Sequence, residues 1–312
     1  MADSVYLKDN LTGFVPKPIA TDIIADVTRG SSILRLSTVQ SMESDNKSFP
    51  VMVNGPGAYW VGEGERAKTA LANWIFPEIV AKKLAVIVPI TKEKVRDTTT
   101  VDIFGTLRTY IAEAFYRKID AACIFGTDSP FAKSIYGVAT SSGMAVQVGT
   151  NDDAKGTHID LDVADVMALV EAKGLDVNAF IAGIGFKNTL RKLRDADGNQ
   201  LFVPNVDQDT LYAHPVEFVR NGTWEDDKAL CIGINRDYSI VGIRDNIEYT
   251  ILTEATLQNT LDADGKPLSL AEQDMVGIKA TMRLGFLPVK EEAFAMLVPK
   301  ASSSTEPATT TP

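Results

Sequence analysis

The residues with the clearest potential for chemistry lie in the segment Gly62-Glu63-Gly64-Glu65-Arg66-Ala67-Lys68-Thr69. Gly62, Lys68 and Thr69 have the spacing of a phosphate-binding loop, in which backbone amides and a lysine hold a nucleotide's phosphates. That motif needs a second glycine where Ala67 stands. The carboxylates of this segment would also place negative charge in the phosphate cradle. We therefore interpret it as a charged hairpin tip rather than a nucleotide site.

A second glycine pattern, Gly183-x-Gly185, follows an apolar run and precedes a basic stretch. This arrangement is similar to the start of a dinucleotide-binding fingerprint. The third glycine position holds Asn188, and no acidic residue follows at the distance that would bind a ribose. A tight turn from a strand into a helix explains the two glycines better.

The segment Asp195-Ala196-Asp197-Gly198 is similar to the first positions of a calcium loop. An EF-hand would need glycine at its sixth position and glutamate at its twelfth, where Gln200 and Val206 stand. Aspartate and glycine favour turns on their own account. We therefore predict a turn and no metal site here.

Nucleophilic and metal-binding side chains are scarce in this chain. Its two histidines are His158 and His214, and no Gly-x-Ser-x-Gly elbow accompanies them. Its two cysteines, Cys123 and Cys231, lie far apart, which excludes a disulfide framework and a zinc site built from cysteine pairs. The sequence predicts no catalytic residue, no cofactor and no bound metal.

The composition is that of a globular protein with a substantial core. Of 312 residues, 45% are apolar and 23% charged, so most of the chain is too rich in apolar residues for disorder. The net charge of −10 argues against a reader of nucleic acid and against a peripheral membrane role. No apolar run approaches the roughly 18 residues of a membrane span, and residues 1–4 do not resemble a secretion signal. We expect a reducing, cytoplasm-like compartment.

The elements around the charged tip form a long hairpin between residues 48 and 91. Phe49-Pro50-Val51-Met52-Val53 begins one limb, and Leu84-Ala85-Val86-Ile87-Val88 ends the other with β-branched residues. A limb of about 12 residues would project on the order of 40 Å. Because a two-stranded ribbon of that length is unstable alone in water, another copy of the chain is expected to cover it.

The strongest helix signal follows the hairpin. Thr99 and Asp102 are predicted to cap its start, and Gly126 is predicted to end it. A span of about 25 residues would measure near 38 Å, which is long for a helix of a globular domain. The apolar stripe at helical spacing consists of Phe104, Leu107, Ile111, Ala114, Phe115 and Ala122.

The rest of the chain is mixed. Residues 1–32 are predicted to form an extended arm with a helical patch over 21–27, and residues 302–312 a loose tail. Further helices are predicted over 162–173, ending at Gly174, and over 186–194. The predicted strands cover 179–182, 231–234, 239–243 and 249–252, followed by a closing pair formed by 278–284 and 293–298.

Several stretches, in this order, resemble the major capsid proteins of tailed bacteriophages of the Hong Kong 97 type. Phe49-Pro50-Val51 and residues 58–64 resemble the outgoing limb and tip of that family's extended loop, and residues 83–93 its returning limb. The residues that resemble the family's long spine helix are 111–115, 119–122 and 126. Arg283-Leu284-Gly285-Phe286 with Ala293-Phe294 resembles the closing strands. The resemblance covers most of residues 10–299.

The resemblance implies an α+β Hong Kong 97-like capsid fold with peripheral and axial domains. The domains expected are an N-terminal arm (1–32), the first part of the peripheral domain (33–47), the extended loop (48–90), the peripheral domain with the spine helix (91–157), the axial domain (158–262), the closing strands of the peripheral domain (263–299) and a flexible tail (300–312).

The function implied is a structural shell that self-assembles from pentamers and hexamers into an icosahedral head around double-stranded DNA, without sequence-specific binding. Portal, scaffolding or decoration proteins are conceivable partners, and the location would be the virion, assembled in the host cytoplasm. The contact residues implied at the loop tip are Trp60, Gly62, Glu63, Gly64, Glu65, Arg66 and Lys68, and those that pack the spine helix are Phe104, Leu107, Ile111 and Phe115.

Two alternatives remain open from the sequence. An encapsulin-type compartment around a cargo enzyme would have the same fold, and the contents of purified particles would distinguish it from a phage head. A monomeric α+β enzyme is disfavoured by the missing motifs.

Overall fold

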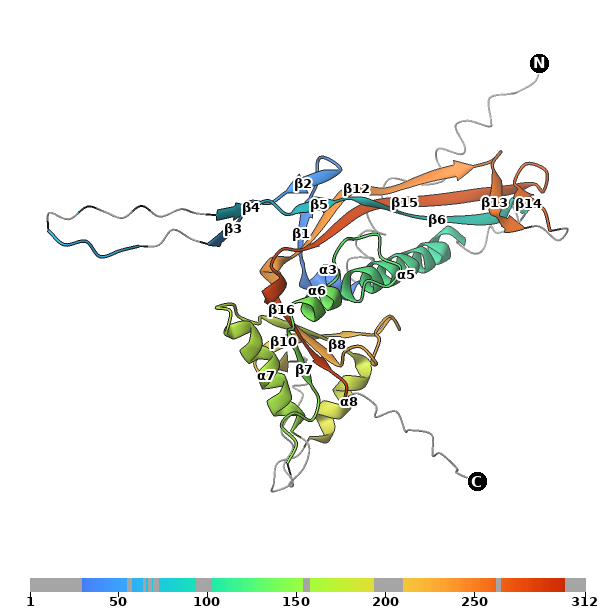
Figure 1. Ribbon diagram of the computed structural model, residues 1–312. Coiled ribbons are helices and arrows are strands. Elements are labelled where there is room, and N and C mark those ends of the chain that lie inside the picture. The colour runs from blue at the N-terminus through green and yellow to red at the C-terminus, as the bar shows by residue number, and fades with distance from the viewer. Residues whose placement is uncertain are drawn as a thin grey trace, which may run out of the picture. The chain divides into compact units, whose positions relative to one another are not determined.

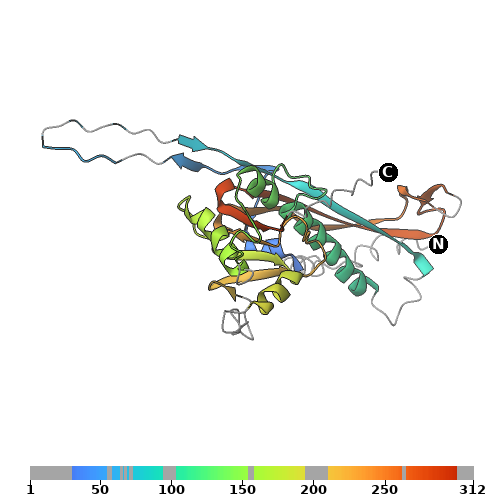
Figure 2. The same cartoon turned by 60° about the horizontal axis from the view of Figure 1, so that its bottom comes forward.

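A computed structural model describes residues 30–54, 58–63, 66, 69, 73–93, 103–153, 158–193, 210–261 and 265–300. The chain divides into two compact units (Figures 1 and 2). The first unit comprises the parts of Met1–Cys123, Asp128–Lys133 and Ser239–Val289 that are described. The second comprises the described parts of Ile124–Thr127, Ser134–Tyr238 and Lys290–Pro312.

The first unit is built on a four-stranded sheet in the order β1-β12-β15-β6. These strands are Thr38–Ser41 (β1), Ser239–Leu252 (β12), Met275–Pro288 (β15) and Lys82–Thr91 (β6), and only the β1–β12 pair is parallel. Alternate residues of β15, from Ile278 to Leu284, are buried while Lys279, Thr281 and Arg283 between them are half-exposed. The strand therefore has one core face and one polar face.

Two helices accompany this sheet. Helix α5, Ile103–Ile124, runs along the sheet in Figures 1 and 2 and ends before Gly126, whose φ of 75° suits a helix stop. The predicted capping residues Thr99 and Asp102 lie outside the described residues. A short helix, α3 (Ser32–Leu36), is buried against α5. Two short strands, β13 (Thr256–Leu261) and β14 (Pro267–Ser269), pair with each other.

The predicted hairpin is present as two consecutive ladders. β2 (Asn46–Ser48) pairs with β5 (Glu78–Val80), and further out β3 (Val51–Asn54) pairs with β4 (Asn73–Ile75). Beyond β3 and β4 the described residues are 58–63, 66 and 69. We call the described part of this hairpin, within residues 46–80, the ribbon. In Figure 1 it projects away from the four-stranded sheet.

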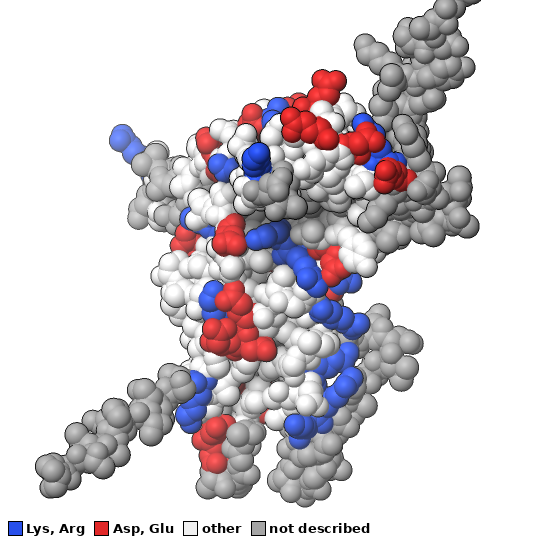
Figure 3. Space-filling model, turned by 90° about the vertical axis from the view of Figure 1, so that its right-hand side faces the viewer, with Lys and Arg blue, Asp and Glu red and all other residues white. Residues whose placement is uncertain are grey.

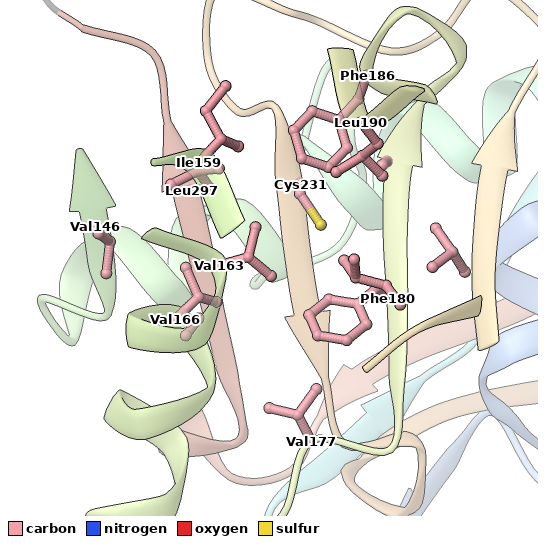
Figure 4. Packing of buried hydrophobic residues seen from close by; sticks show 14 of the residues in the cluster. Val146, Ile159, Val163, Val166, Val177, Phe180, Phe186, Leu190, Cys231 and Leu297 are labelled. Atoms are coloured by element: carbon pink, nitrogen blue, oxygen red, sulfur yellow. The ribbon is translucent and has the colours of Figure 1, made fainter. Parts of the chain in front are cut away.

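The second unit contains a six-stranded sheet in the order β7-β16-β11-β8-β10-β9. Its strands are Ala145–Gln147 (β7), Phe294–Val298 (β16), Cys231–Ile234 (β11), Ala179–Gly183 (β8), His214–Val219 (β10) and Thr210–Leu211 (β9). The helices α7 (Ile159–Glu171) and α8 (Ile184–Lys192) pack side chains such as Val163, Val166, Phe186 and Leu190 onto one face, around Phe180 and Cys231 (Figure 4). Helix α6 (Ile135–Ser141) contacts β16. Short 3-10 turns cover Arg236–Tyr238 and Glu291–Ala293.

Two strand predictions need correction. Residues 239–243 and 249–252 belong to one strand, β12, which crosses the gap with register shifts after Ile243 and Asp245. The expected closing pair does not form, because β15 pairs with β12 and β6 while β16 pairs with β11 and β7. The alternating apolar pattern of β15 and the continuous apolar run of β16 both indicate strands, but neither specifies a partner.

The boundaries between the two compact units do not fall at residues 158 and 262, the ends expected for the axial domain. Residues 134–153 lie in the second unit because β7 pairs with β16, and β12 lies in the first because it pairs with β15. Peripheral and axial describe positions in a shell, so those assignments remain predictions. The predicted arm up to residue 29, the turn at 195–198 and the tail from 301 lie outside the described residues.

Candidate subunit-contact surfaces

The ribbon exposes more large apolar side chains than any other described part of the chain. Trp60 is 105% exposed, Phe76 64% and Tyr59 53%. The other exposed apolar residues of the ribbon are Met52, Val61, Trp74, Ile75 and Val80. A concentration of exposed apolar side chains on one segment is typical of an interaction site.

The predicted tip residues that the structure describes are on the surface of the first unit. Trp60, Gly62, Glu63 and Arg66 are all exposed. Gly64, Glu65 and Lys68 are outside the described residues. An exposed strip with charged and aromatic side chains has the composition of a contact surface in which Trp supplies apolar area.

Part of the predicted apolar stripe of α5 lies among the described residues. Ile111 is 4% exposed and Phe115 2%, while Leu107 is half-buried. The side chain of Phe104 is outside the described residues. The buried stripe is the side of α5 that faces the rest of its unit.

The hydrogen bonds around the buried Asp120 on α5, which we call the clamp, were not predicted from the sequence. The Asp120 carboxylate is 0% exposed and accepts hydrogen bonds from Ser31 Oγ at 2.6 Å and from the backbone N–H groups of Ser32 and Ile33 at 3.2 Å. Ser31 Oγ in turn accepts from the Leu34 N–H and caps α3. Gly30 passes so close to the Tyr116 ring that an added Cβ would lie 2.4 Å from its Cδ1. Aspartate directly after the buried Ile119 was the one available signal.

The glycine turn predicted after β8 is confirmed, and the space beside it is filled. An added Cβ at Gly183 would lie 2.4 Å from Trp224 Cδ1, and the indole Nε1 donates to the Ala229 carbonyl at 2.9 Å. The side chain of Trp224, held by this hydrogen bond, therefore fills the space beside the first glycine of the turn.

The remaining reactive residues lie apart. His158 contacts Asp153, and the His214 ring lies 6.4 Å from the Phe180 ring. Burial raises the pKa of the Cys123 and Cys231 thiols, so both stay protonated near neutral pH. Within the described ranges, no group of three or more His, Cys, Asp or Glu side chains is placed to bind a metal, and no helix is long and apolar enough to cross a membrane.

Comparison with known proteins identifies the family of this chain. Residues 12–298 match the model of the phage capsid family. The chain is 34% identical over 298 residues to the major capsid protein of Staphylococcus phage 80alpha, covering 95% of this chain and 88% of that protein. A solved structure from Microbacterium phage Oxtober96 superposes with a TM-score of 0.74 at 27% identity, covering 87% of this chain and 91% of the other.

A structure from Mycobacterium phage Adephagia gives a TM-score of 0.75 at 23% identity, covering 95% of this chain and 98% of the other, which supports the same α+β fold. The Hong Kong 97-like architecture expected from the sequence is thus confirmed. From its matched length, its similarity to a named capsid protein and its fold, the chain belongs to the phage capsid family.

Proposed function

We propose that this chain is the structural subunit of a tailed-phage head, in which many copies assemble into an icosahedral shell around double-stranded DNA. The observation that carries the proposal is the exposed apolar ribbon of a chain that belongs to the phage capsid family. In the shell, pentamers and hexamers would be the repeating groups, and the ribbon of one copy would lie on its neighbour.

Energetics support a partner for the ribbon. Each ladder of the described ribbon has three or four residues a strand, and a two-stranded ribbon of this kind is marginal in water. Covering apolar surface contributes about 25 cal/mol per Å². A neighbouring copy that covers Trp60, Trp74 and Phe76 would therefore stabilise both the ribbon and the contact.

The proposal includes no catalysis and no cofactor. The enclosed DNA would contact the shell without base-specific recognition, since the chain carries a net charge of −10 and phosphate binding requires clustered cations. The virion would be the location, with assembly in the host cytoplasm, and portal, scaffolding or decoration proteins would be the partners. An encapsulin-type compartment is less favoured, because the relatives are phage capsid proteins.

The test is expression of the chain followed by sedimentation and negative-stain electron microscopy. We expect closed particles or capsomer-sized rings. A folded species of 33.8 kDa that stays monomeric at every concentration would refute the proposal.

The contribution of the ribbon is tested with Trp60→Ala, which removes the most exposed aromatic ring among the described residues. We expect a loss of assembled material on the order of tenfold or more, because truncation of an important interface residue costs more than about 1 kcal/mol and tenfold corresponds to about 1.4 kcal/mol. Trp60→Phe keeps an apolar ring and serves as the matched control. If alanine assembles as well as phenylalanine, the ribbon is not the contact.

A further inference from the structure

A loop of the second unit folds the side chain of Asn221 over the backbone that follows it. The loop comes after β10, and in it Asn221 is half-buried while Gly222 is exposed. The side-chain carbonyl oxygen of Asn221, Oδ1, accepts a hydrogen bond from the Thr223 N–H at 3.1 Å and another from the Thr223 hydroxyl at 2.6 Å. The Asn221 amide therefore lies beside the Gly222 peptide, with two donors on one oxygen.

The same loop contains one of the two Asn-Gly pairs in the sequence, the other being Asn54-Gly55. Because glycine has no Cβ, its backbone nitrogen is the least hindered nucleophile that can follow an asparagine. Gly222 has a φ of 74°, and a Cβ added there would meet no atom within 4 Å apart from its chain neighbours. The space beside this peptide is thus open to water.

We propose that Asn221 is a deamidation site, at which the loop itself promotes the reaction. The Gly222 nitrogen attacks Cγ of Asn221, a bond forms between the two atoms, and the Gly222 N–H proton passes to the departing side-chain nitrogen. The bond from Cγ to Nδ2 breaks and ammonia leaves, which closes a five-membered succinimide ring. Water then opens the ring at either of its carbonyl groups and gives aspartate or isoaspartate at position 221, with no oxidation or reduction.

The two donors from Thr223 assist the attack on Cγ. Negative charge develops on Oδ1 when the Gly222 nitrogen adds to Cγ, and Oδ1 is the atom that both donors already contact. Donors held in place where charge develops lower the barrier, and in a water-excluded active site one such donor contributes roughly a hundredfold or more. Because this loop is partly exposed to water, we expect the Thr223 hydroxyl to contribute about tenfold.

The reaction adds a negative charge to the second unit. Three acidic residues, Glu225, Asp226 and Asp227, follow closely in the chain. On the face of the molecule in Figure 3, the lower part shows a row of Lys and Arg and a separate group of Asp and Glu. One more carboxylate makes the net charge one unit more negative than −10, so ion-exchange chromatography separates deamidated chains from intact ones.

Isoaspartate at position 221 would also disturb the packing nearby, because it adds a methylene to the main chain just before Trp224. The Trp224 ring packs edge-on against Phe125, with ring centres 5.1 Å apart, and fills the space beside Gly183. We therefore expect the melting temperature to fall as the isoaspartate form accumulates.

The test follows the Asn221 amide by peptide mass spectrometry while the purified chain is incubated at mildly alkaline pH, in buffer and in urea. Thr223→Val removes the hydroxyl donor and keeps the shape of the side chain and the N–H, whereas the matched control Thr223→Ser keeps both donors. Asn54 in the same molecules is an internal control, since Thr223 does not follow it. Thermal unfolding reports whether each variant is folded.

We expect Asn221 of the folded wild-type chain to lose its amide at least as fast as in urea. In buffer, Thr223→Val should slow this loss about tenfold, while Thr223→Ser should stay within about twofold of the wild type. In urea the three chains should react alike, and the rate at Asn54 should not depend on residue 223.

A folded wild-type chain that keeps the Asn221 amide much longer than the chain in urea would overturn the inference, because the loop would then protect the residue. Equal rates for wild type and a folded Thr223→Val in buffer would overturn it as well. If Thr223→Val does not fold, the wild-type rates in buffer and in urea still decide. Each measurement uses unassembled chains, so the result is independent of the proposed function.

Discussion

The clamp formed by Asp120 gives the sharpest test of how the first unit is held together. Asp120→Ala removes the acceptor of three hydrogen bonds and leaves Ser31 Oγ and the N–H groups of Ser32 and Ile33 buried without it. A hydrogen bond to a charged group contributes about 1.5–3 kcal/mol. Desolvation of the buried Asp120 carboxylate costs several kcal/mol and offsets part of the free energy that the three hydrogen bonds contribute. The net expectation is a loss of about 3 kcal/mol in the free energy of unfolding.

The assay is thermal and urea unfolding of the unassembled chain. At roughly 2–4 °C for each kcal/mol, the Asp120→Ala chain should melt about 6–12 °C lower than the wild type. Asp120→Asn keeps one acceptor oxygen and should fall between the two. Glu113→Gln on the same helix, which breaks only the surface pair with Arg117 at 2.7 Å, should cost at most about 0.5 kcal/mol. An Asp120→Ala chain as stable as Glu113→Gln would refute the clamp.

Three further predictions follow. Gly285→Ala should lower the free energy of unfolding by about 1–3 kcal/mol in urea, because the added Cβ would lie 2.9 Å from the Val80 carbonyl oxygen in β5. The control Gly185→Ala should not destabilise the chain, because its added Cβ would lie 4.0 Å from the nearest atom, Asp226 Oδ2. Hydrogen bonds from Lys228 and Thr127 lower the pKa of Glu225. The ionised Glu225 therefore stabilises the folded chain above its usual pKa near 4.5, and this stabilisation is lost as the pH falls through the lowered pKa. In thermal melts at graded pH, Glu225→Gln should reduce the loss of stability on the acid side. The Cys123 and Cys231 thiols should resist an alkylating reagent at pH 8 in the folded chain and react on unfolding; rapid native labelling would contradict their burial.

Local patterns in the sequence predicted the elements, while their partners depended on distant residues. The stripe from Leu107 to Phe115 and the apolar run at 179–182 each indicate a helix or a strand without reference to the rest of the chain. β15 and β16 lie in different sheets because each pairs with strands far away in the sequence, and the residues of these two strands do not indicate those partners. Asp120 was missed because a buried carboxylate is recognised by its donors, which lie about 88 residues away in the chain.

The exposed tip shows what the composition can predict about the candidate site. Composition predicted that residues 60–68 would be surface rather than pocket, and the described ones are exposed.

The parallel pairing of β1 with β12 has a consequence for the order in which the chain folds. Thr38 pairs with Ile240, and Ser37 Oγ lies 2.6 Å from Ser239 Oγ. During synthesis the ribosome releases the ribbon long before it makes β12 and β15, so the first unit cannot complete its sheet until residue 288 has emerged. Folding dominated by such distant pairs is slow, and exposed apolar strands are prone to aggregate while they wait. We therefore expect newly made chains to depend on chaperones, with ribbon-mediated association delayed until translation is almost finished.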